Sequence, residues 1–110
     1  MATPDAFEKE PVLMKTMMER LHLEDLATVG FYQREFARRG FRDLGFWDGK
    51  EHFRTHYSRL GEELGRRREE LVGVEGVEEA ALERQMAGLG KWVEAADKGC
   101  VEWGVFCFGR

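Results

Sequence analysis

The sequence predicts an all-α protein, a four-helix bundle organised around a long antiparallel helical hairpin. The main indication is an apolar series in the last third of the chain whose spacings alternate between four and three residues, the a/d pattern of a helix that packs along another helix. A shorter series with helical spacing precedes it. The two series comprise Phe53, Tyr57, Leu60 and Leu64, and then Leu82, Met86, Leu89, Val93, Ala96, Cys100, Trp103 and Cys107.

Size and composition agree with a folded domain. The 110 residues are 43% hydrophobic and 35% charged and include only two prolines, which is typical of globular rather than disordered proteins. A chain of this length suits one domain, residues 1–110, with a core whose stability depends on good helix packing or on a partner.

Two shorter helices are predicted in the N-terminal part, over residues about 12–22 and about 25–39. Pro11 favours a new helix start, and a wide apolar face follows it as far as His22. Acidic residues precede the second segment, where a helix N-terminus favours negative charge. Gly40 follows two arginines and has the sequence context of a helix C-cap.

The two long helices are predicted over residues about 48–72 and about 77–106. Residues 41–47 form an aromatic-rich connection that is too apolar for a solvated loop. Asp48 and Glu51 have the spacing of a capping box, so the first long helix is expected to begin at this point. Glycines at both ends of the segment 73–76 indicate a turn between the two long helices.

Folding the second long helix back onto the first brings the two apolar series into register. Leu60 then meets Leu89, and Tyr57 meets Trp92 or Val93. Phe53 similarly meets Ala96, and Leu64 meets Met86. This agreement between two independently identified patterns supports the hairpin.

Four glycines complicate the last helix. Gly88, Gly90, Gly99 and Gly104 lie inside the predicted segment, where each glycine costs about 0.5–1 kcal/mol relative to alanine. They indicate either a break near Gly88 and Gly90 or places where a bulky neighbour approaches closely, for which we considered Phe31, Phe36 and Trp47.

The charge distribution disfavours a nucleic-acid-binding protein. The net charge is −4, residues 34–68 carry ten basic and six acidic side chains, and residues 69–110 carry four basic and nine acidic ones. A basic middle and an acidic end predict segments that face one another. The arginines at 66–68 lie among glutamates at helical spacing, the pattern of a solvated, salt-bridged face. No nucleic-acid recognition motif accompanies them.

The sequence also predicts a soluble protein of the cytoplasm or nucleus. No apolar run approaches the roughly 18 residues of a membrane span, and the acidic, proline-containing N-terminus does not resemble a secretory signal. Cys100 and Cys107 both fall on the apolar series of the last helix. Helical geometry would separate them by about 10 Å, too far for a disulfide, so we expect reduced, buried cysteines.

The main functional hypothesis is a helical protein–protein interaction or assembly module that is not an enzyme, has no cofactor and associates with a protein partner or with a second copy of itself. No catalytic or phosphate-binding motif is present. Aromatic residues gathered in one place are typical of interaction hot spots. The predicted contact surface comprises Phe41, Leu44, Phe46, Trp47, Trp103, Phe106 and Phe108.

The alternative hypothesis is a helical bundle that binds a small molecule or a metal ion between the two long helices. This alternative includes an enzyme. His52 and His56 stand four residues apart, a spacing that aligns two imidazoles on one helix face, and the register places Asp97 across from them. Tyr57 and Trp92 complete this candidate site. The sequence disfavours a dinuclear carboxylate-bridged iron site, because the Glu-x-x-His motif occurs only once, at Glu19 to His22.

Overall fold

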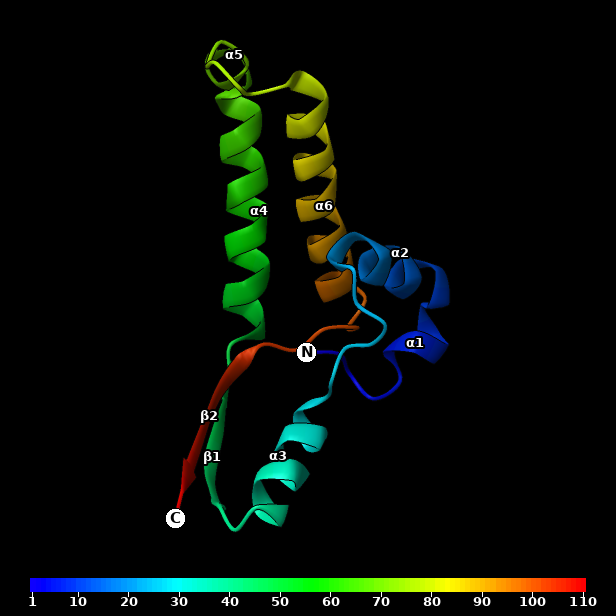
Figure 1. Ribbon diagram of the computed structural model, residues 1–110, viewed down its shortest axis with the longest axis vertical. Coiled ribbons are helices and arrows are strands. Elements are labelled where there is room, and N and C mark those ends of the chain that lie inside the picture. Colours follow the sequence, from blue (N-terminus) through cyan, green and yellow to red (C-terminus); the bar gives the residue numbers. More distant parts are fainter.

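The computed structural model describes all 110 residues as six helices and two strands in an elongated arrangement of 53 × 29 × 24 Å. The elements follow one another as α1 (Ala6–Lys9), α2 (Pro11–Leu21), α3 (Val29–Arg38), β1 (Arg42–Asp48), α4 (Lys50–Arg66), α5 (Arg68–Val72), α6 (Glu79–Asp97) and β2 (Gly104–Gly109). Figure 1 shows the α4–α6 hairpin at one end of the long axis and the two strands with α3 at the other.

Helices α4 and α6 lie side by side and antiparallel, joined by α5 and a short turn (Figure 1). The predicted register is visible in the stacking of Tyr57 on Trp92, whose ring centroids are 5.8 Å apart. Ion pairs connect the basic middle of the chain to its acidic end, as the charge distribution predicted. Arg68 contacts Glu79 at 2.6 Å, and Arg54 pairs with Asp97 near the opposite end of the hairpin.

The hydrophobic core lies beside the hairpin, where α1 and α2 meet the C-terminal end of α6. Its largest fully buried side chain is Met14 of α2, and Ala95 of α6 is equally inaccessible. The N-terminus closes this core, because Ala2 forms an isolated antiparallel bridge with Val101. The core comprises Ala2, Ala6, Leu13, Met14, Met17, Met18, Ala95, Cys100 and Val101.

Strands β1 and β2 form a two-stranded antiparallel sheet, in which Phe46 is opposite Phe106 and Trp47 is opposite Val105. Helix α3 covers one face, and Phe36 of this helix stacks on Phe108 with ring centroids 4.1 Å apart. Trp47 and Val105 lie on the other face and are each more than half exposed. A two-stranded sheet is marginal by itself, so the packing of α3 supports it.

The all-α fold class is therefore wrong, and the last predicted helix contains the main error. Helix α6 ends at Asp97, and the chain leaves it through Gly99 in the left-handed conformation, with φ of +66°. Glycine adopts this conformation without strain, and it is a frequent way for a helix to end. The aromatic connection at 41–47 is likewise a strand, so the molecule is a mixed α/β structure.

Helix α6 runs unbroken through Gly88 and Gly90, so of the two alternatives for these glycines the break is absent. Two local expectations also need correction. Asp48 does not cap α4: its carboxylate accepts a hydrogen bond from the Lys50 backbone at 3.0 Å, and Gly49 is the N-cap. The second N-terminal helix begins at residue 29 rather than 25, because the Thr28 hydroxyl caps it by accepting a hydrogen bond from the backbone N–H of Phe31, three residues further on.

The two cysteines are both free but differ in environment. Cys100 is buried in the core, and burial raises the pKa of its thiol. Cys107 is an exposed residue of β2, so its predicted place on a buried helix face is wrong. No helix has the length and apolar character that crossing a membrane requires.

We predict that Met14→Ala lowers the free energy of unfolding by about 2–5 kcal/mol, the usual cost of removing a large buried side chain. Val12→Ala is the matched control on the same helix, because Val12 is 78% exposed. Its effect should stay within about 0.5 kcal/mol. Urea denaturation followed by circular dichroism measures both. Equal effects of the two substitutions would show that the core is not where the structure places it.

Candidate functional site

The site is built on an aromatic cluster at the sheet-proximal half of the hairpin. Phe53 and Tyr57 come from adjacent turns of α4, with ring centroids 4.7 Å apart. Trp92 of α6 meets both: it lies edge-on to Phe53 at 5.6 Å and stacks on Tyr57 at 5.8 Å. The cluster joins the two helices and has a cavity on either side, with Tyr57 lining both.

The first cavity, which we call the aromatic cavity, has a volume of about 410 Å³ and is lined by His52, Phe53, His56, Tyr57 and Trp103. Every side chain in its wall carries an aromatic or imidazole ring, and none is a carboxylate. The faces of such rings attract cations, particularly those that carry apolar substituents. The composition of this wall therefore fits a small organic cation.

Trp103 reaches the aromatic cavity because Gly49 has no side chain. A Cβ at Gly49 would lie 2.5 Å from the Trp103 ring, closer than real Cβ contacts. The Gly49 backbone N–H donates a hydrogen bond to the Trp103 carbonyl at 2.8 Å. Trp47 packs edge-on to Trp103 at 6.0 Å. The junction between β1 and α4 thus holds the tryptophan that closes this end of the site.

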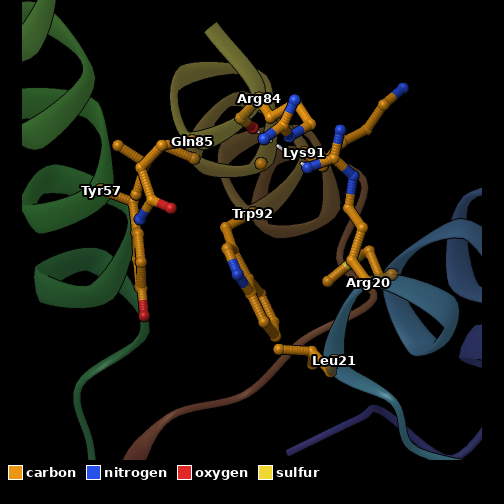
Figure 2. A pocket seen from close by; sticks show the side chains of 10 residues that line it. Arg20, Leu21, Tyr57, Arg84, Gln85, Lys91 and Trp92 are labelled. Carbon is orange, nitrogen blue, oxygen red and sulfur yellow. Dashed lines mark hydrogen bonds between the residues drawn. The ribbon is translucent and has the colours of Figure 1, made fainter. Parts of the chain in front are cut away.

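The second cavity, which we call the basic cavity, lies between α2 and α6 and has a volume of about 280 Å³. Figure 2 shows Trp92 in its centre, Tyr57 approaching from α4, and Arg20 extending from α2 toward Arg84 and Lys91 of α6. No carboxylate lines it. Three cationic side chains around one hollow without acidic residues favour an anionic ligand.

A glycine again explains how a side chain reaches the site. The Arg20 guanidinium donates a hydrogen bond to the Arg84 carbonyl at 3.2 Å. A Cβ at Gly88 would lie 2.9 Å from Nη1 of Arg20, so a larger residue at this position would displace the guanidinium. Glycine in a helix interior costs about 0.5–1 kcal/mol. The close neighbour of Gly88 is therefore an arginine, and none of the aromatic residues considered from the sequence.

Four of the five residues of the predicted small-molecule site line these two cavities. His52 and His56 belong to the aromatic cavity, Trp92 to the basic cavity and Tyr57 to both. Asp97 lines neither. It accepts hydrogen bonds from Arg54, one of them at 3.2 Å, and these bonds hold the pKa of its carboxyl below the usual range. The side chains of His, Cys, Asp and Glu form no group of three that would hold a metal ion.

The structure places the residues of the predicted interaction surface on or beside the two strands. Phe46, Phe106 and Phe108 belong to the aromatic layer between the sheet and α3. Trp103 lines the aromatic cavity. Among the other members, Phe41 packs on Phe36, Trp47 packs on His52 and Trp103, and Leu44 is exposed beside Gly109.

Sequence reasoning missed the two arginines and placed Trp103 on a helix. Arg20 was part of the first N-terminal helix, and nothing in its local pattern indicated a contact 64 residues away with Arg84. One signal was available. Gly88 stands in the middle of a good helix, which indicates a close neighbour, but the pattern does not say which residue that neighbour is.

The known proteins that are similar to this chain are named as enzymes. No protein-family model matches the chain. It is 35% identical over 98 residues to the sarcosine/dimethylglycine N-methyltransferase of Halorhodospira halochloris, covering 89% of this chain and 34% of that protein. It is 38% identical over 89 residues to the glycine/sarcosine/dimethylglycine N-methyltransferase of Actinopolyspora halophila, covering 81% of this chain and 15% of that protein.

A solved structure shares the fold. It is described as a sarcosine dimethylglycine methyltransferase from Galdieria sulphuraria, and it superposes with a TM-score of 0.77 at 23% identity, over 86% of this chain and 34% of that one. The chain thus spans about a third or less of the length of these proteins. The likeness supports a mixed α/β fold in place of the helical bundle.

These comparisons overturn the main functional hypothesis. The proteins similar to this chain are named as enzymes acting on small molecules, so the interpretation as a self-associating assembly module without catalytic function is wrong. The alternative hypothesis, a small-molecule site between the long helices of an enzyme, is the one that they favour.

We predict that the aromatic cavity binds tetramethylammonium and not its uncharged analogue of similar shape, tert-butanol. The cation should shift the indole N–H resonance of Trp103 in a nuclear magnetic resonance titration. Tyr57→Leu should weaken this binding by about 0.5–2 kcal/mol, the range of a cation–π contact, which is roughly twofold to thirtyfold in affinity. Tyr32→Leu on α3 is the matched control and should leave the affinity unchanged. Equal responses to the cation and the alcohol would contradict the prediction.

Proposed function

We propose that the chain is the substrate-binding portion of an N-methyltransferase that acts on small methylated amino acids of the sarcosine and dimethylglycine type. The observation that carries this proposal is the aromatic cavity, whose wall of rings without a carboxylate suits a methylated ammonium group. The names of the proteins similar to the chain point to the same substrate class.

The chemistry of such a reaction agrees with the side chains present. Methylation of an amine nitrogen moves positive charge onto that nitrogen as the new N–C bond forms. Faces of Phe53, Tyr57 and Trp103 would stabilise this developing charge more than the neutral amine, which is the requirement for catalysis. The imidazoles of His52 and His56 lie in the same wall. Either can accept the proton that a substrate ammonium loses before its nitrogen attacks.

The residues of this chain do not fit a methyl-donor site by themselves. A nucleoside-containing cofactor is typically held by a glycine-rich turn between a parallel strand and a helix. The two strands here are antiparallel, and β1 passes into α4 through a single glycine whose surroundings are filled by tryptophan rings. We therefore assign donor binding to structure outside these 110 residues, and the hairpin to the substrate side.

We keep the cytoplasm or nucleus as the expected compartment. Both cysteines are free, and one of them is exposed. Exposed thiols persist in reducing compartments, whereas secreted proteins usually contain disulfides.

Replacement of the similar region in a known enzyme tests the proposed function. We predict that the Halorhodospira halochloris enzyme with its matched 98 residues exchanged for this chain still methylates dimethylglycine. Tyr57→Leu in this chimera should lower kcat/KM by roughly twofold to thirtyfold, again the range of a cation–π contact. Product formation measured by mass spectrometry gives both values, and the unaltered enzyme is the positive control. A folded chimera that transfers no methyl group would contradict the proposal.

A further inference from the structure

The basic cavity has no part in the proposed methyl transfer, yet three cationic side chains and no carboxylate line it. Several arginines of the hairpin have carboxylate partners: Arg54 pairs with Asp97, and Arg68 with two glutamates. Arg20 and Arg84 form no ion pair, although they face the same cavity. Two uncompensated guanidinium groups therefore lie around one hollow.

Arg20 is held in place and keeps free donors. One of its terminal nitrogens donates to the Arg84 carbonyl, and the missing side chain of Gly88 provides the room for this contact. A guanidinium has five N–H donors, so most of those of Arg20 stay available to a ligand. This contact directs the guanidinium toward α6, which lowers the entropy that a ligand must overcome to order it.

Apart from Gln85 and Lys91, the remaining wall is mostly apolar and includes Trp92, Leu21 and Met17 (Figure 2 shows the first two beside Arg20). A volume of about 280 Å³ admits a small molecule only. Lys91 contributes a third cation, whose ammonium also contacts Glu94 at 3.3 Å.

We propose that the basic cavity is a second ligand site, which binds a small organic carboxylate with its anionic group on Arg20 and Arg84 and its carbon skeleton against Trp92. A carboxylate matches the planar donor fork of arginine in a bidentate manner. The apolar wall favours a ligand with a carbon body over a bare inorganic anion. This site does not rest on the methyl-transfer proposal. Its ligand is an anion rather than a cation, and it binds on the other side of Tyr57.

The probe for this site is 3,3-dimethylbutanoate, which has a carboxylate and a bulky apolar group but no positive charge. Titrated into the full chain, it should shift the indole N–H resonance of Trp92 and the Nε–H resonance of Arg20 while leaving that of Trp103 unchanged. Its alcohol analogue, 3,3-dimethylbutan-1-ol, should bind at least tenfold more weakly. Inorganic phosphate should also bind at least tenfold more weakly. Equal affinity for the alcohol would overturn the role of charge, and equal affinity for phosphate would overturn the organic ligand.

Three variants separate the cavity from general charge effects. Arg20→Gln and Arg84→Gln should each weaken binding of the carboxylate at least fivefold. Gly88→Ala should weaken it similarly without removing a charge, because the new Cβ displaces the Arg20 guanidinium. Arg34→Gln, the same charge change on α3, is the matched control and should leave binding unaltered. Circular dichroism checks that each variant is folded.

Loss of affinity in Arg34→Gln equal to that in Arg84→Gln would overturn the site in favour of non-specific charge attraction. Retained affinity in both Arg20→Gln and Arg84→Gln would overturn it outright. These outcomes are independent of the chimera experiment: a chimera that methylates dimethylglycine while the chain ignores 3,3-dimethylbutanoate would leave the proposed function intact and remove only the second site.

Discussion

The stacking of Tyr57 on Trp92 is the contact on which the site depends. The two rings lie at an interplanar angle of 26°, and Phe53 extends the same cluster toward the sheet. Flat rings of this size fill the space between α4 and α6 but leave hollows at their edges. Branched aliphatic side chains in the same positions would fill these hollows. Tyr57 lines both hollows, whereas Trp92 and Trp103 each line one. One packed pair of rings therefore joins the hairpin and also separates a cavity suited to cations from one suited to anions.

Two glycines determine which side chains enter these cavities. Gly49 lies under the Trp103 ring at a distance that excludes a Cβ, and Gly88 lies under the Arg20 guanidinium, which a Cβ there would displace. Neither has a positive φ, so close approach rather than backbone conformation requires glycine here. The tryptophan comes from the connection just before β2 and the arginine from α2, and both contacts bring these segments onto the hairpin. The fold thus assembles a site from four elements, although each wall consists mainly of residues on α4 or α6.

The hairpin could be predicted from the sequence because its signals are local and repeated, and the Tyr57–Trp92 contact follows from the register of two helical patterns. The sheet could not be predicted in the same way. Residues 104–109 consist of apolar side chains between two glycines, so positions at spacings of three and four are apolar whether the segment is a helix or a strand. Its partner strand lies about 60 residues earlier, which leaves no local trace of the pairing. Lys98 and Gly99 do form a helix-ending pair like Arg39 and Gly40, and this comparison would have ended the last helix correctly.

The central claim, that the stack of Tyr57 on Trp92 divides two cavities of opposite ligand preference, is tested most directly by a crystal structure of the chain soaked with tetramethylammonium and 3,3-dimethylbutanoate together. The account predicts the cation against Trp103 and Phe53, the carboxylate on Arg20 and Arg84, and the two rings still stacked between them. Both ligands in one cavity, or Tyr57 and Trp92 apart, would contradict it.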